Sequence, residues 1–209
     1  MYALRISPKY KSRDWKALDP KNPDDWAEAA EVVRDRLEGR FMQFATISWR
    51  HKYSGFVVLA IDSLLAETIQ QFKEGITDGT GKSGQMIIRF LEGVRFQPDF
   101  DTDARKAFYT DIRCGLLHQA EAKKMWLIRR NQPTLLQKVS HGQGYIIDVE
   151  RFHAAIQDSL DDYLALVRDA QSQSLRDNLW VKMDHICHVR EARGVLYEAE
   201  EDSPQEDST

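Results

Sequence analysis

The sequence lacks the features that would cross-link, export or anchor the chain. Only two cysteines occur among 209 residues, and both fall inside helical patterns, so a reducing compartment is favoured over a disulfide framework. The first residues contain no apolar run typical of a signal peptide. The longest apolar run, residues 56–61, is far shorter than the roughly 20 residues that a membrane span requires. We therefore expect a soluble cytoplasmic protein with no membrane partner.

A large net charge of either sign is also lacking. The formal net charge is −4, and the residues from Glu198 onward hold six carboxylates without a lysine or arginine, which leaves +2 on the rest of the chain. Tight nucleic-acid binding through bulk charge needs many Lys and Arg contacts, because counterion release drives it. This balance argues against such binding but is compatible with a local basic face.

Apolar residues recur at three- and four-residue steps along most of the chain, which predicts helices. The expected helices cover residues 24–47, 56–72, 85–92, 102–124, 152–167 and 175–186. Short β-branched or aromatic segments at about 126–149 predict a β-hairpin or a three-stranded insert. The helix at 85–92 is short, so the expected fold class is all-α, a bundle of four to five long helices with a small β insert.

Three regions follow from composition and periodicity. Residues 1–23 lack a steady period and predict an irregular N-terminal arm that packs on the body through Trp15. Residues 24–197 carry the helical pattern and predict one domain. Residues 198–209 are acidic and contain Ser and Pro, which predicts disorder.

Two short stretches resemble a cofactor-binding motif and a metal-binding motif, but their residue spacing does not match either motif. Gly81-Lys82-Ser83 resembles the end of a phosphate-binding loop, but that motif needs glycine where this chain has Ile76, and it should follow a strand. Residues 184–188 hold Asp, His and Cys close together, yet neighbouring helical positions point in different directions and no second ligand pair supports them. We expect neither a cofactor nor a metal.

One arginine and one histidine stand out within residues 108–121. On a helical wheel Arg113 and His118 flank a face that also holds Cys114 and Leu117. The opposite, core-facing side holds Phe108, Ile112 and Leu116. A helix that is partly apolar on both sides suits a subunit interface or a cleft.

The pair has a chemical and a structural interpretation. An imidazole can take a proton from a ribose 2′-hydroxyl or give one to the leaving 5′-oxygen, and a guanidinium can grip the phosphate and stabilise its growing charge. In the structural interpretation, Arg113 pairs with a carboxylate such as Glu121, and His118 caps a helix or packs in the core.

The stretch Asp111-Ile-Arg-Cys-Gly-Leu-Leu-His-Gln-Ala-Glu121 resembles the HEPN superfamily, whose motif is Arg, four to six residues, then His. The resemblance covers about residues 24–170. It implies an all-α homodimer whose motif helices form a composite cleft, and many such proteins are metal-independent endoribonucleases, often toxins or bacterial defence effectors. Carried over, Arg113 is the phosphate clamp and His118 the general acid/base.

The resemblance also bears on the neighbouring positions. Cys114 and Leu117 would lie at the dimer seam. Active members often have Asn or Asp after the arginine, where this chain has Cys114, and this favours the alternative of a non-catalytic dimeric binding or assembly module. The expected partners are RNA, a second copy and an antitoxin or defence-system protein.

Basic residues follow the motif with an aromatic among them. Such a pattern can guide single-stranded RNA and stack a base, although lysines here would also complement the negative end of a helix dipole. The expected RNA-binding residues are Lys123, Lys124, Trp126, Arg129 and Arg130. The histidines expected at the surface or in the hairpin are His51, His141 and His153.

Overall fold

The computed structural model describes residues 4–139 and 144–192, which are mainly helical with one small sheet. The helices are α1 (Ser12–Lys16), α2 (Asp25–Leu37), α3 (Gln43–Ser48), α4 (Gly55–Glu74), α5 (Ser83–Phe90), α6 (Thr102–Ala107), α7 (Cys114–Gln119), α8 (Val149–Arg168) and α9 (Gln173–Ala192). The strands are β1 (Met125–Arg129), β2 (Leu136–Lys138) and β3 (Gly144–Asp148). The expected helical class is confirmed. The predicted tail at 198–209 lies outside the described residues.

Two π-helical turns join neighbouring α-helices into longer ones. The turn over Glu38–Met42 joins α2 to α3, and the turn over Phe108–Arg113 joins α6 to α7. The predicted helix at 24–47 is thereby confirmed. The residue before the helix, Asp24, makes no capping hydrogen bond with its side chain. The Asp25 carboxylate instead accepts hydrogen bonds from the preceding turn, including one of 2.7 Å from the Asp19 amide.

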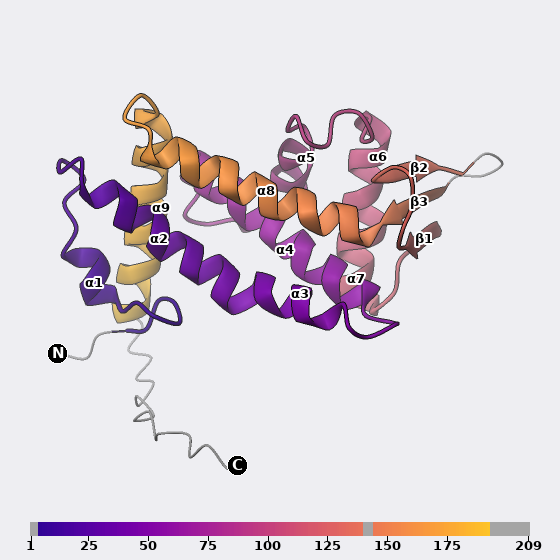
Figure 1. Cartoon of the computed structure of the whole chain (residues 1–209), viewed down its shortest axis with the longest axis horizontal. Coiled ribbons are helices and arrows are strands. Elements are labelled where there is room, and N and C mark those ends of the chain that lie inside the picture. Colours follow the sequence, from indigo (N-terminus) through magenta and orange to yellow (C-terminus); the bar gives the residue numbers. More distant parts are fainter. Residues whose placement is uncertain (1–3, 140–143, 193–209) are drawn as a thin grey trace, which may run out of the picture.

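Three long helices run side by side along the molecule: the α2–α3 helix, α4 and α8 (Figure 1). At one end α9 crosses them, and at the other lie the α6–α7 helix and the sheet. The N-terminal arm contains α1, which the sequence did not predict. Its Trp15 is fully buried and contacts Trp180 of α9, with ring centroids 4.6 Å apart, so the expected anchoring role of Trp15 is confirmed.

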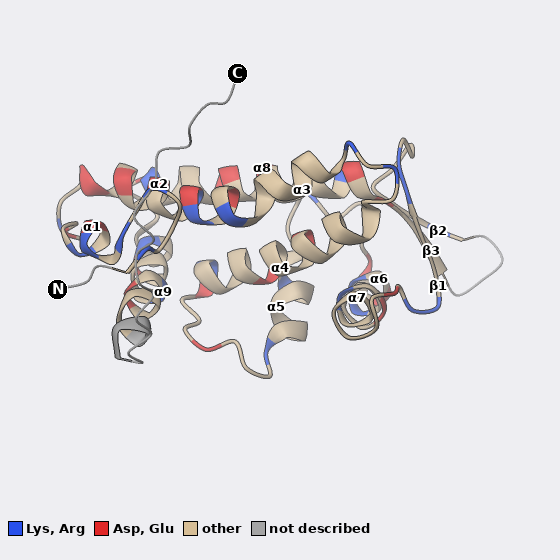
Figure 2. Cartoon of the chain, turned by 90° about the horizontal axis from the view of Figure 1, so that it is seen from below, with Lys and Arg blue, Asp and Glu red and all other residues tan. Residues whose placement is uncertain are grey.

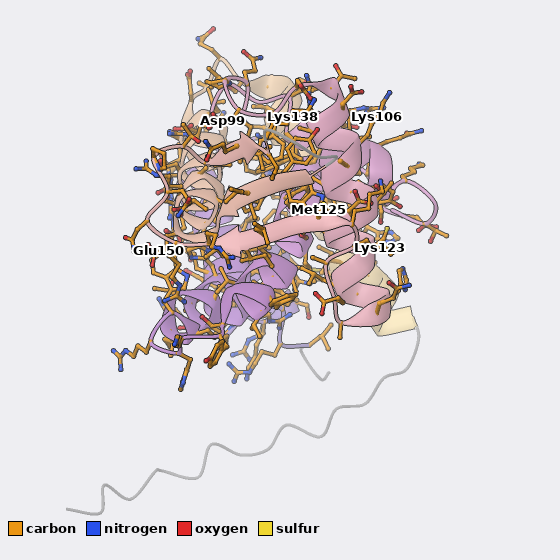
Figure 3. The ribbon with its side chains drawn as sticks, turned by 90° about the vertical axis from the view of Figure 1, so that its right-hand side faces the viewer. Asp99, Lys106, Lys123, Met125, Lys138 and Glu150 are labelled. Atoms are coloured by element: carbon orange, nitrogen blue, oxygen red, sulfur yellow. The ribbon has the colours of Figure 1, made fainter. Side chains whose placement is uncertain are left out.

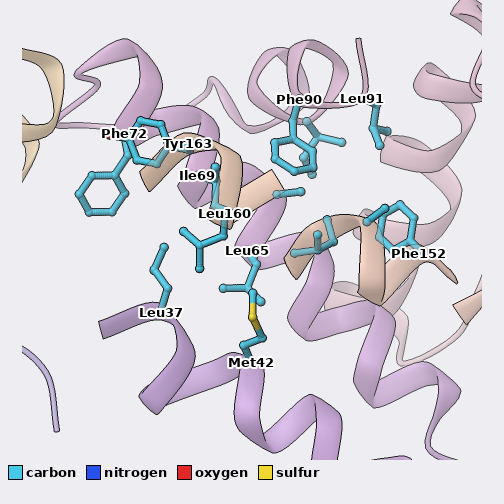
Figure 4. Packing of buried hydrophobic residues seen from close by; sticks show 14 of the residues in the cluster. Leu37, Met42, Leu65, Ile69, Phe72, Phe90, Leu91, Phe152, Leu160 and Tyr163 are labelled. Carbon is cyan, nitrogen blue, oxygen red and sulfur yellow. The ribbon is translucent and has the colours of Figure 1, made fainter. Parts of the chain in front are cut away.

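The core lies where α4 meets α8 and the α2–α3 helix. Leu65, Ile69 and Phe72 on α4 pack toward Leu160 of α8 and Leu37 of α2 (Figure 4). Among the described residues α4 alone is long and apolar enough to cross a membrane by length and composition. The same composition is typical of the central helix of a bundle, and the contacts of α4 with α8 and α9 place it there.

The helix that carries the motif, residues 102–119, is hereafter called the motif helix. It is capped by Asp101, whose side chain accepts a hydrogen bond of 2.7 Å from the Ala104 amide. It ends at Ala120, which has a left-handed backbone with φ 54°, so the expected extension to residue 124 is wrong. The chain then folds back along the helix.

A glycine allows this return. The returning chain is held against the helix by a hydrogen bond of 2.9 Å from the Lys123 amide to the carbonyl oxygen of Asp111. A Cβ atom at Gly115 would collide with the carbonyl oxygen of Glu121. Only glycine therefore fits where the returning backbone crosses α7.

The expected β insert is a three-stranded sheet in the order β1-β3-β2. β2 pairs with β3 as an antiparallel hairpin, whereas β1 pairs parallel to β3, with Met125 opposite Gly144. Figure 3 looks onto this end of the molecule, with Lys123 and Met125 near one end of β1 and Lys138 on β2. The next helix, α8, is capped by Asp148, whose carboxylate accepts hydrogen bonds from two backbone amides of its first turn.

Candidate functional site

Arg113 lies at the junction of the motif helix with α4 and α5. Its Nη2 donates hydrogen bonds of 3.0 Å to Oε2 of Glu67 on α4 and of 3.0 Å to Oγ of Ser83 at the start of α5. The Ser83 hydroxyl in turn donates a 2.5 Å hydrogen bond to Oε1 of Glu67. The Tyr109 ring lies beside the guanidinium, 5.9 Å from its carbon to the ring centroid. Three elements thus hold one cation in a fixed orientation.

The remaining donors of this guanidinium are available. Arginine carries N–H groups on Nε and on both Nη atoms. Both of these hydrogen bonds use Nη2, and within residues 4–139 and 144–192 neither Nε nor Nη1 of Arg113 has a hydrogen-bond partner. The side chain is 18% exposed. Arg113 is therefore anchored through Nη2, while Nε and Nη1 keep unused donors.

The carboxylate that holds Arg113 differs from the one that the structural interpretation suggested. Glu121 is exposed beyond the end of the motif helix, and its carboxylate faces the Ala122 amide. Sequence reasoning missed Glu67 and Ser83, which lie 46 and 30 positions from Arg113. The one sequence feature that could have indicated Glu67 is its position as a carboxylate within the apolar pattern of α4. Ser83 belongs to the Gly-Lys-Ser stretch that fails as a nucleotide-binding loop.

His118 lies on α7 and is exposed to solvent. It neither caps a helix nor packs in the core, which corrects the structural interpretation, and its ring has no hydrogen-bond partner in the described part of the chain. Leu117 beside it is 50% exposed, and Cys114 is a half-buried free thiol. Burial, reinforced by the Cys114 thiol, raises the pKa of Tyr109 above its ordinary value.

The five expected RNA-binding residues do not form one surface. Trp126 is only 6% exposed, and its ring packs against Phe108 and Tyr145, so the predicted stacking of a base on Trp126 is corrected. The Lys124 ammonium pairs with the buried Asp111 carboxylate at 3.1 Å. Lys123 is half-buried after the motif helix.

The two arginines lie at the far end of β1, about 13 Å along the strand from its first residue. Arg130 binds the loop after α3: its Nη1 donates a 3.1 Å hydrogen bond to the Trp49 carbonyl oxygen, and its Nη2 donates a 2.8 Å bond to Ser54 Oγ. Arg129 is exposed, and its side chain donates a 3.5 Å hydrogen bond to the carbonyl oxygen of Ile128, its one such bond to the described residues. Arg129 is thus the freer of the two cations.

His153 is fully buried, which corrects its predicted surface position. Its Nδ1 lies 2.7 Å from Oδ1 of the equally buried Asp62, and its Nε2 lies 3.1 Å from the Thr46 hydroxyl. Burial raises the pKa of Asp62, and the His153 hydrogen bond opposes that shift. Asp62 Oδ2 has no hydrogen-bond partner among the residues that the structure describes. His51 is exposed as expected, and His141 lies outside the described residues.

The residues once considered as metal ligands have other contacts. Asp184 Oδ1 accepts a 2.9 Å hydrogen bond from the indole of Trp15, and the Asp184 carbonyl accepts one from His188. The described residues contain no group of three or more His, Cys, Asp or Glu side chains placed to hold a metal ion. Asp184 therefore helps to fix α1 on α9.

Comparison with protein-family models, with curated proteins and with solved structures finds no match to this chain. The resemblance to the HEPN superfamily therefore stays a prediction from the sequence.

Proposed function

We propose that this protein is a metal-independent endoribonuclease of HEPN type, which cleaves RNA by attack of a ribose 2′-hydroxyl on the adjacent phosphate. One observation supports this most: a guanidinium fixed by Glu67 and Ser83, with free donors, lies on the same helix as an exposed imidazole without a partner. Its biological role would be that of a cytoplasmic toxin or defence effector, with an antitoxin or another defence protein as partner.

The chemistry requires a base, an acid and a cation. A base removes the proton of the 2′-hydroxyl, and the 2′-oxygen attacks the phosphorus. The bond from phosphorus to the 5′-oxygen breaks, and an acid gives that oxygen a proton. His118 can act as base or acid, while Arg113 holds the phosphate oxygens and stabilises their growing charge. The products are a 2′,3′-cyclic phosphate and a 5′-hydroxyl.

The separation of the two side chains favours a cleft made by two copies. Five α-helical steps place Arg113 and His118 about 140° apart around the axis and about 7.5 Å apart along it. Within one chain the two side chains therefore point away from each other and do not face the same phosphate. Two motif helices that meet face to face would bring the arginine of each copy toward the histidine of the other, and would supply a second imidazole as the acid.

Exposed apolar side chains on three neighbouring helices support this dimer. α4 contacts both α3 and α7, and Figure 2 shows it between them. Phe44 and Ile47 on α3, Val57 on α4 and Leu117 on α7 are each about half exposed. Clustered exposed apolar side chains mark interaction surfaces. We propose that a second copy covers this face.

The nuclease proposal predicts cleavage of single-stranded RNA by the purified protein in the presence of EDTA. The matched control is the same oligonucleotide made of deoxyribose, which should stay intact because it has no 2′-hydroxyl to attack. Gel electrophoresis of end-labelled strands measures both. Cleavage of the deoxyribose strand at a comparable rate would exclude this mechanism.

The dimer proposal predicts that Leu117→Glu gives a monomer at micromolar concentration, because two copies of the substitution would bury unpaired carboxylates at the seam. Light scattering should show a dimer for the wild type. Leu166→Glu on α8 is the control, since Leu166 is similarly exposed, at 47%, and lies outside the proposed face. A wild-type monomer would contradict the composite cleft.

The ion pair between Arg113 and Glu67 favours a second function. Glu67 already neutralises Arg113, and Cys114 follows it where active HEPN proteins often have Asn or Asp. Both features suit a non-catalytic dimer that binds or assembles with other molecules. The EDTA assay separates the two functions, because the binding module would leave RNA intact.

A further inference from the structure

A groove lies where the loop after α3, the start of α4 and the end of β1 meet. It has a volume of about 430 Å³. Its lining includes apolar side chains of Phe56 and Ile128, and also Lys52, Tyr53 and Arg129. Apolar, aromatic and basic groups thus share one groove that the motif does not account for.

Tyr53 is the most noticeable of these groups because it is 84% exposed, the highest value among the large apolar side chains of the described residues. The Lys52 ammonium lies 5.5 Å from the centroid of its ring. Folding gains little from a ring that stays in water. An exposed ring next to a cation is, however, a platform on which an unpaired base can stack.

The charges around the groove favour phosphate. Lys52 and Arg129 have no carboxylate partner in the parts of the chain that the structure describes. Arg130 is the exception, because Glu150 lies 3.8 Å from it. Its hydrogen bonds to the loop after α3 instead hold that loop against the end of β1. Arg130 shapes the groove, and the other two cations remain free for a ligand.

The groove and the Arg113 site lie at different points along α4, the groove at Phe56 near its start and Arg113 at Glu67 further on. Glu67 lies eleven positions after Phe56 on this helix, a distance of about 16 Å at the α-helical rise. A short single strand can span that distance. A strand whose phosphate meets Arg113 can therefore place a flanking nucleotide in the groove.

We propose that this groove is a subsite for single-stranded RNA, in which Tyr53 stacks on an unpaired base and Lys52 and Arg129 bind the adjoining phosphates. The choice of RNA as ligand rests on the proposed function, whereas binding in the groove does not require His118. A duplex is a poor ligand for this subsite because its bases are already stacked and paired.

The test measures binding of a fluorescent single-stranded RNA to the full chain carrying His118→Ala, so that cleavage does not interfere. Adding Tyr53→Ala should weaken binding about 5- to 150-fold, the range for loss of one stacked base. Tyr53→Phe keeps the ring and should bind like the parent. Arg129→Gln should weaken binding and reduce its salt dependence. Lys21→Ala, in the exposed arm, is the control for loss of a distant cation.

Tyr53 is exposed, so these variants should keep the circular dichroism and melting temperature of the parent. If Tyr53→Ala binds single-stranded RNA as tightly as the parent, or if duplex RNA binds as well as the single strand, the subsite is wrong. If the wild type cleaves no RNA but Tyr53→Ala still weakens binding, the subsite stands and the nuclease proposal fails.

Discussion

Replacing His118 with alanine is expected to reduce RNA cleavage about 100- to 10,000-fold, the usual contribution of a general acid or base. The imidazole is exposed and has no hydrogen-bond partner among the described residues, so its loss should change the free energy of unfolding by less than about 0.5 kcal/mol. Cleavage rates in EDTA and urea unfolding measure the two effects separately. Any growth arrest caused by overexpression should disappear with the same substitution.

The neighbouring Gln119→Ala provides the control, because Gln119 is also exposed on α7. Its cleavage rate should stay close to the wild-type rate. Arg113→Ala should also abolish cleavage, but it removes the cation that pairs with Glu67 and so lowers stability as well. His118 is therefore the cleaner test of chemistry. Wild-type cleavage by His118→Ala would remove this residue from the mechanism.

Replacing Asp62 with alanine is expected to lower the free energy of unfolding by about 1–3 kcal/mol, the cost of leaving a buried hydrogen-bonding group without its partner. Asp62 and His153 are both fully buried, and their hydrogen bond is 2.7 Å long. Without Asp62, the Nδ1 of His153 would face a cavity. Urea unfolding measures the loss.

Asp62→Asn is the matched control, since its side-chain amide can still form a hydrogen bond with Nδ1 of His153. It should retain most of the wild-type stability. An Asp62→Ala variant as stable as Asp62→Asn would show that the buried pair contributes nothing to the fold.

The same pair predicts a pH dependence with a definite sign. Burial raises the pKa of Asp62 in the folded protein, so the folded state holds this proton more tightly than the unfolded chain does. That contribution is present below the unfolded pKa of about 3.9 and is lost as the pH rises through the higher folded pKa. Asp62→Asn should therefore gain stability relative to the wild type across that window. A relative loss with rising pH would contradict the raised pKa.

Periodicity was sufficient to locate the long helices but could not reveal their π-helical turns. The expected helix over 24–47 matches residues 25–48, although a turn of different pitch lies within it at Glu38–Met42. The motif helix stops at Ala120, whose left-handed backbone turns the chain back so that the Lys123 amide reaches the Asp111 carbonyl. Neither glycine nor proline marks that end in the sequence.

The candidate site was predictable only in part. The helical pattern identified Arg113 and His118 and the exposed position of Leu117, because those depend on local geometry. The partners of Arg113 come from α4 and α5, and no local pattern connects segments so distant along the chain. His153 was misplaced because a polar residue in an apolar pattern is usually exposed, whereas here Asp62 stabilises it inside the core.

The central claim is that Arg113 and His118 cleave RNA through the 2′-hydroxyl, and analysis of the product ends tests it most directly. RNA fragments produced by the wild-type protein in EDTA should carry a 2′,3′-cyclic phosphate and a 5′-hydroxyl, and His118→Ala should yield almost none. Fragments that end in a 3′-hydroxyl and a 5′-phosphate, or equal yields from the two proteins, would contradict the claim.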